Sequence, residues 1–357
     1  MRRRAQGFSM VELMVAITLA LLLTGAVLAV FIGSRSAYQS TAGVGDLSNS
    51  GRFALGLIGE SARGAGNLAC NSAMSATSET VIPGPTFVNN FGLGVEGFEA
   101  NGTTPPVAIA QPAAPVVGAA NNWTPNLDPG MTGAIPAGPG QPVKGSDVLV
   151  VRSAVPRVAP VYTTADVGPG AATLTVTPLP VAVIGGGYAA VSDCTKSVIF
   201  SLPGGVASGA TAVNLNAGLP GVGFSAGAVL TPLTTTVYYI GTGSDGDSSL
   251  WRLEQVNGGP GFAAPEELVP EVENMQVLYG IDSAGTQTAS AYVTADQVGA
   301  TNVVSIQVAL LVASPPGAKA QVGVPAFNLL GTQVTAPADM RMRKVFNATI
   351  NLRNAVN

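Results

Sequence analysis

The N-terminal stretch reads Gly7-Phe-Ser-Met-Val-Glu12-Leu-Met-Val-Ala-Ile-Thr-Leu-Ala-Leu-Leu-Leu-Thr-Gly-Ala-Val-Leu-Ala-Val-Phe-Ile-Gly-Ser34. No charged residue occurs from Leu13 to Ser34, and about 20 apolar residues suffice for a helix to cross a bilayer. The sequence therefore predicts one membrane-spanning helix. Glu12 departs from this pattern. A carboxylate at the edge of an apolar segment is costly in lipid unless it is shallow or paired, so Glu12 is a candidate functional residue.

The residues before this stretch indicate its orientation. Arg2, Arg3 and Arg4 precede the apolar run, and basic residues are retained on the cytoplasmic side of a membrane. The rest of the chain is therefore expected beyond the membrane. An ordinary secretory signal would have a shorter apolar core with a small-residue cleavage site after it. Here the small residue, Gly7, comes first.

The arrangement Gly7-Phe8-Ser-Met-Val-Glu12 resembles the class III signal of type IV prepilins and pseudopilins. The resemblance implies that a membrane peptidase cleaves after Gly7 and methylates the new N-terminus, Phe8. It also implies that Glu12 pairs with the N-terminal amine of a neighbouring subunit. The alternative is an uncleaved signal anchor in which Glu12 lies at the membrane interface.

Composition narrows the class of protein. The 357 residues are 47% hydrophobic and only 10% charged, with 45 Gly and 26 Pro, which is typical of a loop-rich, β-leaning extracellular protein. The net charge is −4, and no basic patch in the middle of the chain predicts a specific nucleic-acid partner. The absence of histidine removes the commonest general base and zinc ligand. We expect no metal, no cofactor and no enzymatic activity.

The chain has two cysteines, Cys70 and Cys194. Beyond the membrane an even pair predicts a disulfide, with two free thiols as the alternative. The bond would close a loop of about 125 residues, for which chain entropy gives up to about 5 kcal/mol.

A helical pattern continues past the membrane segment. The first proline is Pro83, and Leu47, Ala54, Ile58 and Ala62 share one face at helical spacing. We expect a helix from Phe8 to about Gly66, close to 90 Å long. Its glycines lower helix propensity, so a local break around residues 43 to 51 is expected.

The later part of the chain carries strand patterns. Apolar and polar residues alternate with period 2 in several segments, as in half-buried antiparallel strands. Thr235–Ile240 and Ser249–Glu254 flank a Gly- and Asp-rich turn, which predicts a hairpin. The other expected strands are Ser146–Arg152, Ala172–Thr177, Ser197–Leu202, Val303–Leu311 and Phe346–Leu352. The predicted fold class is α+β, with the long helix packed on a β-rich antiparallel-sheet domain.

Other segments narrow the resemblance. The stretch from Gly51-Arg-Phe-Ala to Cys70, the Val272-Glu-Asn-Met-Gln-Val-Leu-Tyr-Gly-Ile-Asp282 run and the closing Leu352-Arg-Asn354 are similar to PilW-type minor pilins. Gln307 stands where the family usually has arginine. The resemblance implies a leader at residues 1–7, a membrane or pilus-core helix at 8–34, an amphipathic continuation at 35–69 and a globular domain at 70–357. Residues 72–145 form a loop-rich region that is expected to vary.

Several segments match part of a known functional motif but lack the other residues that the function needs. Gly223-Phe-Ser225-Ala-Gly227 matches a hydrolase nucleophile elbow, but the chain has no histidine to activate the serine. Asp245-Gly-Asp247 resembles the start of a calcium loop without its later ligands, so a hairpin turn is favoured. Trp123 is expected to anchor a loop on the core rather than to contact a partner. Arg341, Arg343, Lys344 and Arg353 give a basic C-terminal end whose default interpretation is a solvated strand face.

The function that the resemblance implies is a minor pilin that helps to initiate type IV pilus assembly and lies at the pilus tip. Its partners would be other minor pilins, the major pilin and prepilin peptidase. It would reside in the inner membrane with a cytoplasmic N-terminus, and in a surface pilus after assembly. Two alternatives remain: a pseudopilin of a type II secretion system, and a membrane-anchored adhesin that binds through residues 72–145.

Overall fold

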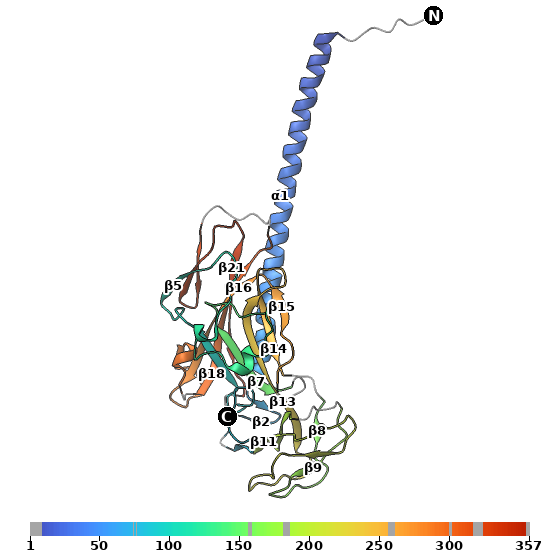
Figure 1. Cartoon of the computed structure of the whole chain (residues 1–357), viewed down its shortest axis with the longest axis vertical. Helices are drawn as coiled ribbons and strands as arrows, with labels where there is room; N and C mark the ends of the chain where they lie inside the picture. The colour runs from blue at the N-terminus through green and yellow to red at the C-terminus, as the bar shows by residue number, and fades with distance from the viewer. Residues whose placement is uncertain are drawn as a thin grey trace, which may run out of the picture.

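The computed structural model describes residues 9–73, 75, 77–155, 159–180, 186–255, 261–299, 302–316 and 324–354. One long helix, α1 (Met10–Arg63), projects from a β-rich domain (Figure 1). Its 54 residues span about 80 Å. No break occurs at residues 43 to 51, so that expectation was wrong. Gly43 and Gly51 are buried against the domain, and this packing offsets their low helix propensity.

Two large sheets and several small ones make up the described part of the domain. The ten-stranded sheet has the path β3 (Ser78–Thr80), β11 (Ser197–Ser201), β10 (Tyr188–Ser192), β13 (Val229–Thr242), β7 (Val148–Ala154), β4 (Val95–Ala100) and β6 (Trp123–Thr124). Strand β13 also pairs with β8 (Val161–Tyr162) and with β14 (Ser248–Glu254), and β14 pairs with β15 (Glu266–Pro270). The four-stranded sheet is β17 (Ala291–Val293), β16 (Val272–Asp282), β18 (Asn302–Ala313) and β21 (Arg343–Asn351).

Smaller elements complete the domain. A three-stranded sheet contains β19 (Ala326–Leu329), β20 (Thr332–Thr335) and β5 (Val107–Ala110). The two-stranded sheets are β1 (Asn67–Leu68) with β2 (Asn71–Ser72), and β9 (Thr173–Thr175) with β12 (Ala212–Asn214). The short helices are η1 (Ala120–Asn122), α2 (Pro129–Thr132) and η3 (Ala295–Gln297).

The second half of α1 shares one hydrophobic core with both large sheets. Its buried residues are Gly43, Leu47, Gly51, Ala54, Ile58, Gly59 and Ala62. They pack against apolar side chains of β7, β13, β14, β16, β18 and β21. Phe346 on β21 lies directly over Gly51, where an added Cβ would come within 2.3 Å of the ring. A helix glycine is therefore required at this contact.

The hairpin expectation is confirmed, because β13 pairs with β14 from Thr236↔Glu254 to Thr242↔Ser248. The remaining expected strands are present with shifted ends. The loop-rich region 72–145 contains four strands, β3 to β6, besides α2 and η1. Trp123 is buried and donates its indole N–H to the carbonyl of Ser146 at 2.8 Å. This region is therefore anchored on the core along much of its length.

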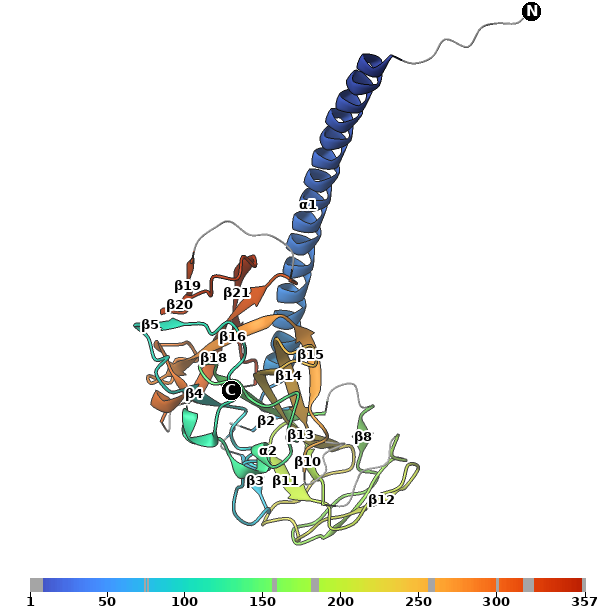
Figure 2. The same ribbon diagram turned by 45° about the horizontal axis from the view of Figure 1, so that its top comes forward.

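The far end of the domain is a separate lobe. Strands β8, β9, β11 and β12 gather there, at the end opposite the N-terminus of α1 (Figures 1 and 2). This lobe has its own hydrophobic cluster, centred on Leu174, Val198 and Phe200. The disulfide between Cys70 and Cys194 ties it to the chain that leaves α1.

Candidate assembly site

Glu12 lies in the first turn of α1, and its side chain is exposed. The backbone N–H of Leu13 donates to the carbonyl of Ser9 at 3.1 Å, which closes this turn. No ion pair to the Glu12 carboxylate occurs among residues 9–354 where the structure describes them. Gly7 and Phe8 lie outside the described residues. The first turn thus carries one unpaired carboxylate beside the partial positive charge of a helix N-terminus.

The first half of α1 has no partner within the chain. Its most apolar 18-residue window has a mean hydropathy of 2.7 and is 0% buried. It is the one helix in the described part of the chain that is long and apolar enough to cross a membrane. Figure 2 shows this half standing clear of the domain. Because exposed apolar surface of this extent is unfavourable in water, it requires lipid or other apolar helices around it.

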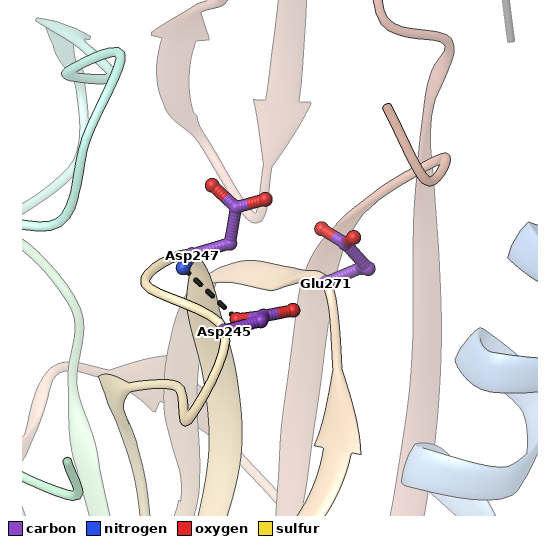
Figure 3. Close-up of side chains that lie close together, drawn as sticks. All are labelled: Asp245, Asp247 and Glu271. Carbon is purple, nitrogen blue, oxygen red and sulfur yellow. Dashed lines mark hydrogen bonds between the residues drawn. The ribbon is translucent and has the colours of Figure 1, made fainter. Parts of the chain in front are cut away.

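Three carboxylates form a compact cluster beside the β13–β14 turn. Carboxylate oxygens of Asp245, Asp247 and Glu271 all lie within 4.8 Å of one another (Figure 3). Arg341 donates to Asp247 at 3.1 Å and also pairs with Glu271. Asp245 accepts the backbone N–H of Asp247 at 3.0 Å, which closes the turn. The Arg341 guanidinium supplies the positive charge here, so this arrangement does not support a calcium site.

Most of the basic C-terminal end is also paired. Arg343 donates to Glu273 at 2.7 and 2.8 Å and to Asp339 at 2.5 Å. Hydrogen bonds from Arg343 hold the pKa of Asp339 at about 2, well below its usual range. Arg341 and Arg343 therefore lock the start of β21 to β16. Lys344 and Arg353 remain as exposed basic residues.

Ser225 does not sit in a hydrolase elbow. Phe224 forms an isolated backbone bridge with Val167, and the carbonyl of Ser225 accepts the Thr163 hydroxyl at 3.2 Å. No strand-to-helix turn positions this serine, since the neighbouring described elements are β12 and β13. The motif is a turn in the distal lobe, in line with the missing histidine.

A pair of buried acids between the two large sheets had no signal in the sequence. Asp147 accepts the backbone N–H groups of Ala100 and Val277 at 2.9 and 2.8 Å, which connects β4 to β16. Glu99 accepts the Thr103 hydroxyl at 3.2 Å. Burial raises the pKa of Glu99 to about 7, and repulsion from Asp296 adds to this shift. Burial also raises the pKa of Asp147 well above its usual range, and repulsion from Glu99 adds to that shift.

Two family models match the chain. Residues 237–354 match the type IV pilus-assembly protein W family, and residues 2–28 match the prokaryotic N-terminal methylation motif. These two matches support a PilW-family type IV pilin with a prepilin signal. The PilW match begins in β13 and runs through both sheets that hold α1. Membership in a pilin family points to a structural rather than a catalytic role.

Among solved structures, a type IV-like pilin from Thermus thermophilus, TTHA1219, is 20% identical, with a TM-score of 0.25 over 35% of this chain and 70% of that chain. No curated protein matched. The two family matches indicate a minor pilin of pilus assembly. Its apolar helix anchors it in the inner membrane before it reaches the pilus at the cell surface.

Proposed function

We propose that this PilW-family pilin joins other minor pilins in the complex that initiates pilus assembly and remains at the pilus tip. The observation that carries the proposal is the first half of α1, which is uncharged and largely apolar from Leu13 to Ser34, does not pack on its own domain and begins with an exposed carboxylate at Glu12. Such a surface is suited to packing against the helices of neighbouring subunits.

Processing prepares the helix for this packing. Prepilin peptidase cleaves after Gly7, and Phe8 becomes the methylated N-terminus. The new amine of a neighbouring subunit pairs with Glu12 when the helices leave the lipid. An unpaired buried carboxylate in a low-dielectric helix bundle costs several kcal/mol. The pair therefore fixes the axial register between subunits.

The test compares Glu12→Ala with Glu12→Asp in cells that express the full chain. We expect normal amounts of processed Glu12→Ala protein in the membrane, because the apolar span is unchanged. We expect at least about a tenfold loss of this subunit from sheared pili, since removing one partner of a buried ion pair leaves the other charge uncompensated and costs more than about 1.4 kcal/mol. Glu12→Asp should retain part of the incorporation.

Mass spectrometry of the mature N-terminus checks the processing step. A methylated Phe8 terminus is expected. An intact Met1, or pili that contain Glu12→Ala at the wild-type level, would contradict the proposal.

A further inference from the structure

Strand β21 forms a free edge of the four-stranded sheet. It pairs with β18 along its whole length, from Arg343↔Ala313 to Asn351↔Ser305. No other described strand pairs with it. Its nine residues present about 30 Å of open backbone.

Two backbone hydrogen bonds show which residues face the open side. Leu352 N–H donates to the carbonyl of Val304 at 2.9 Å, and Ser314 N–H donates to that of Met342 at 2.7 Å. In an antiparallel pair, alternate residues bond to the partner and the residues between them point away. The N–H and C=O groups of Val345, Asn347, Thr349 and Asn351 therefore face away from β18.

This edge lacks the usual protection against pairing. Exposed edges are normally blocked by proline, charge, bulges or a covering element. From Val345 to Asn351 there is no proline and no charged residue, and Asn347, Thr349 and Asn351 are exposed. The edge at β15 differs, because it contains Pro270 and its Glu266 pairs with Arg252 at 2.6 Å.

The position of β21 identifies the kind of partner. Phe346 packs on Gly51 of α1, and β21 runs beside the helix at the domain end nearest its apolar half (Figure 2). A subunit whose helix packs along α1 therefore brings its domain next to this edge. Exposed Lys344 and Arg353 lie at the two ends of the neutral run.

We propose that β21 is an assembly surface that pairs, through its backbone, with an extended strand of an adjoining pilin subunit. Carboxylates near the ends of that strand meet Lys344 and Arg353. Backbone pairing of this kind supplies affinity with little demand on sequence. The inference rests on the proposed function, because the adjoining subunit is the one that packs along α1.

The first test removes an outward N–H group. Asn347→Pro eliminates the donor that faces the partner and keeps every bond to β18, since edge strands tolerate proline where the N–H faces outward. Asn347→Ala, which keeps the N–H, is the matched control. We expect both proteins at wild-type levels in the membrane, and about tenfold less Asn347→Pro than Asn347→Ala in sheared pili. Equal incorporation of the two variants would overturn the proposal.

The second test needs no backbone change. A photoreactive p-benzoylphenylalanine at Thr349 in the full chain should cross-link to another pilin, and the adduct should map to a strand of that subunit. The same group at exposed Gln333 on β20 is the control and should give at least tenfold less adduct. No adduct at Thr349, or an adduct that maps to a helix, would overturn the assignment even if Asn347→Pro failed to accumulate. Loss of Glu12→Ala from pili alongside normal Asn347→Pro would leave the proposed function intact and remove β21 from it.

Discussion

The two halves of α1 form one uninterrupted helix with opposite surroundings. Residues 10–34 are exposed all round, whereas the half that follows buries a stripe that includes Leu47, Ala54 and Ile58. The side chains of the first half are mostly large and apolar. The second half has small residues at positions where the sheets approach the helix. The same backbone is thus adapted to two environments by side-chain size. The outer half keeps its contacts for other subunits, and the inner half holds the domain.

Replacing one isoleucine in each half of α1 should give the largest difference in the free energy of unfolding. Ile58 is 0% exposed and Ile32 is 62% exposed. Ile58→Ala should lower the free energy of unfolding of the domain by about 2 to 5 kcal/mol through lost burial and a residual cavity. Ile32→Ala should leave it within about 0.5 kcal/mol. Thermal unfolding of the full chain in detergent, followed by circular dichroism of the sheets, measures both. Equal effects would show that the domain does not depend on the inner half.

Glycines also distinguish the two halves of α1. A side chain at Gly51 would collide with Phe346, whereas a Cβ at Gly25 has nothing within 4 Å. Gly51→Leu should destabilise the domain by about 1 to 3 kcal/mol through overpacking, and Gly25→Leu should not. Adding Phe346→Ala to Gly51→Leu should restore part of the loss, because the two side chains would occupy the same space. An additive double variant would mean that the collision is not the cause.

The sequence predicted the parts of this molecule that depend on local patterns. Apolar spacing identified both halves of α1, and period-2 alternation identified β18, β21 and the β13–β14 hairpin. It missed the unbroken helix through Gly43 and Gly51. The reason for Gly51 is Phe346, about 300 residues away along the chain. Strand order was inaccessible for the same reason.

Some candidate site residues could be predicted from the sequence, and others could not. Glu12 was found because a carboxylate is conspicuous in an apolar run. The pairing of Arg341 and Arg343 with acids on and before β16 was not foreseen, since only the sheet register places those residues together. The interpretation of these arginines as a solvated basic face was therefore wrong for both of them.

The smallest expected effect is a pH dependence confined to the packed end of the molecule. Glu99 lies near Asp147, Asp296 and the Thr103 hydroxyl, and burial raises its pKa from 4.5 to about 7.

A raised folded-state pKa means that protonated Glu99 stabilises the domain fully below pH 4.5, and that this contribution is lost as the pH rises to about 7. The free energy of unfolding should fall by about 1 kcal/mol over that window, after allowance for solvent screening. Glu99→Gln should flatten this part of the pH profile, leaving only the slope due to Asp147. Asp296→Asn removes a charge that raises the pKa of Glu99, so it should make the fall in stability with rising pH slightly smaller. Urea unfolding between pH 4 and pH 8 measures all three proteins. If the free energy of unfolding of Glu99→Gln falls with pH as steeply as that of the wild type, another group causes the pH dependence. If the helicity of residues 10–34 changes with pH to the same extent, the effect is not confined to the packed half of α1.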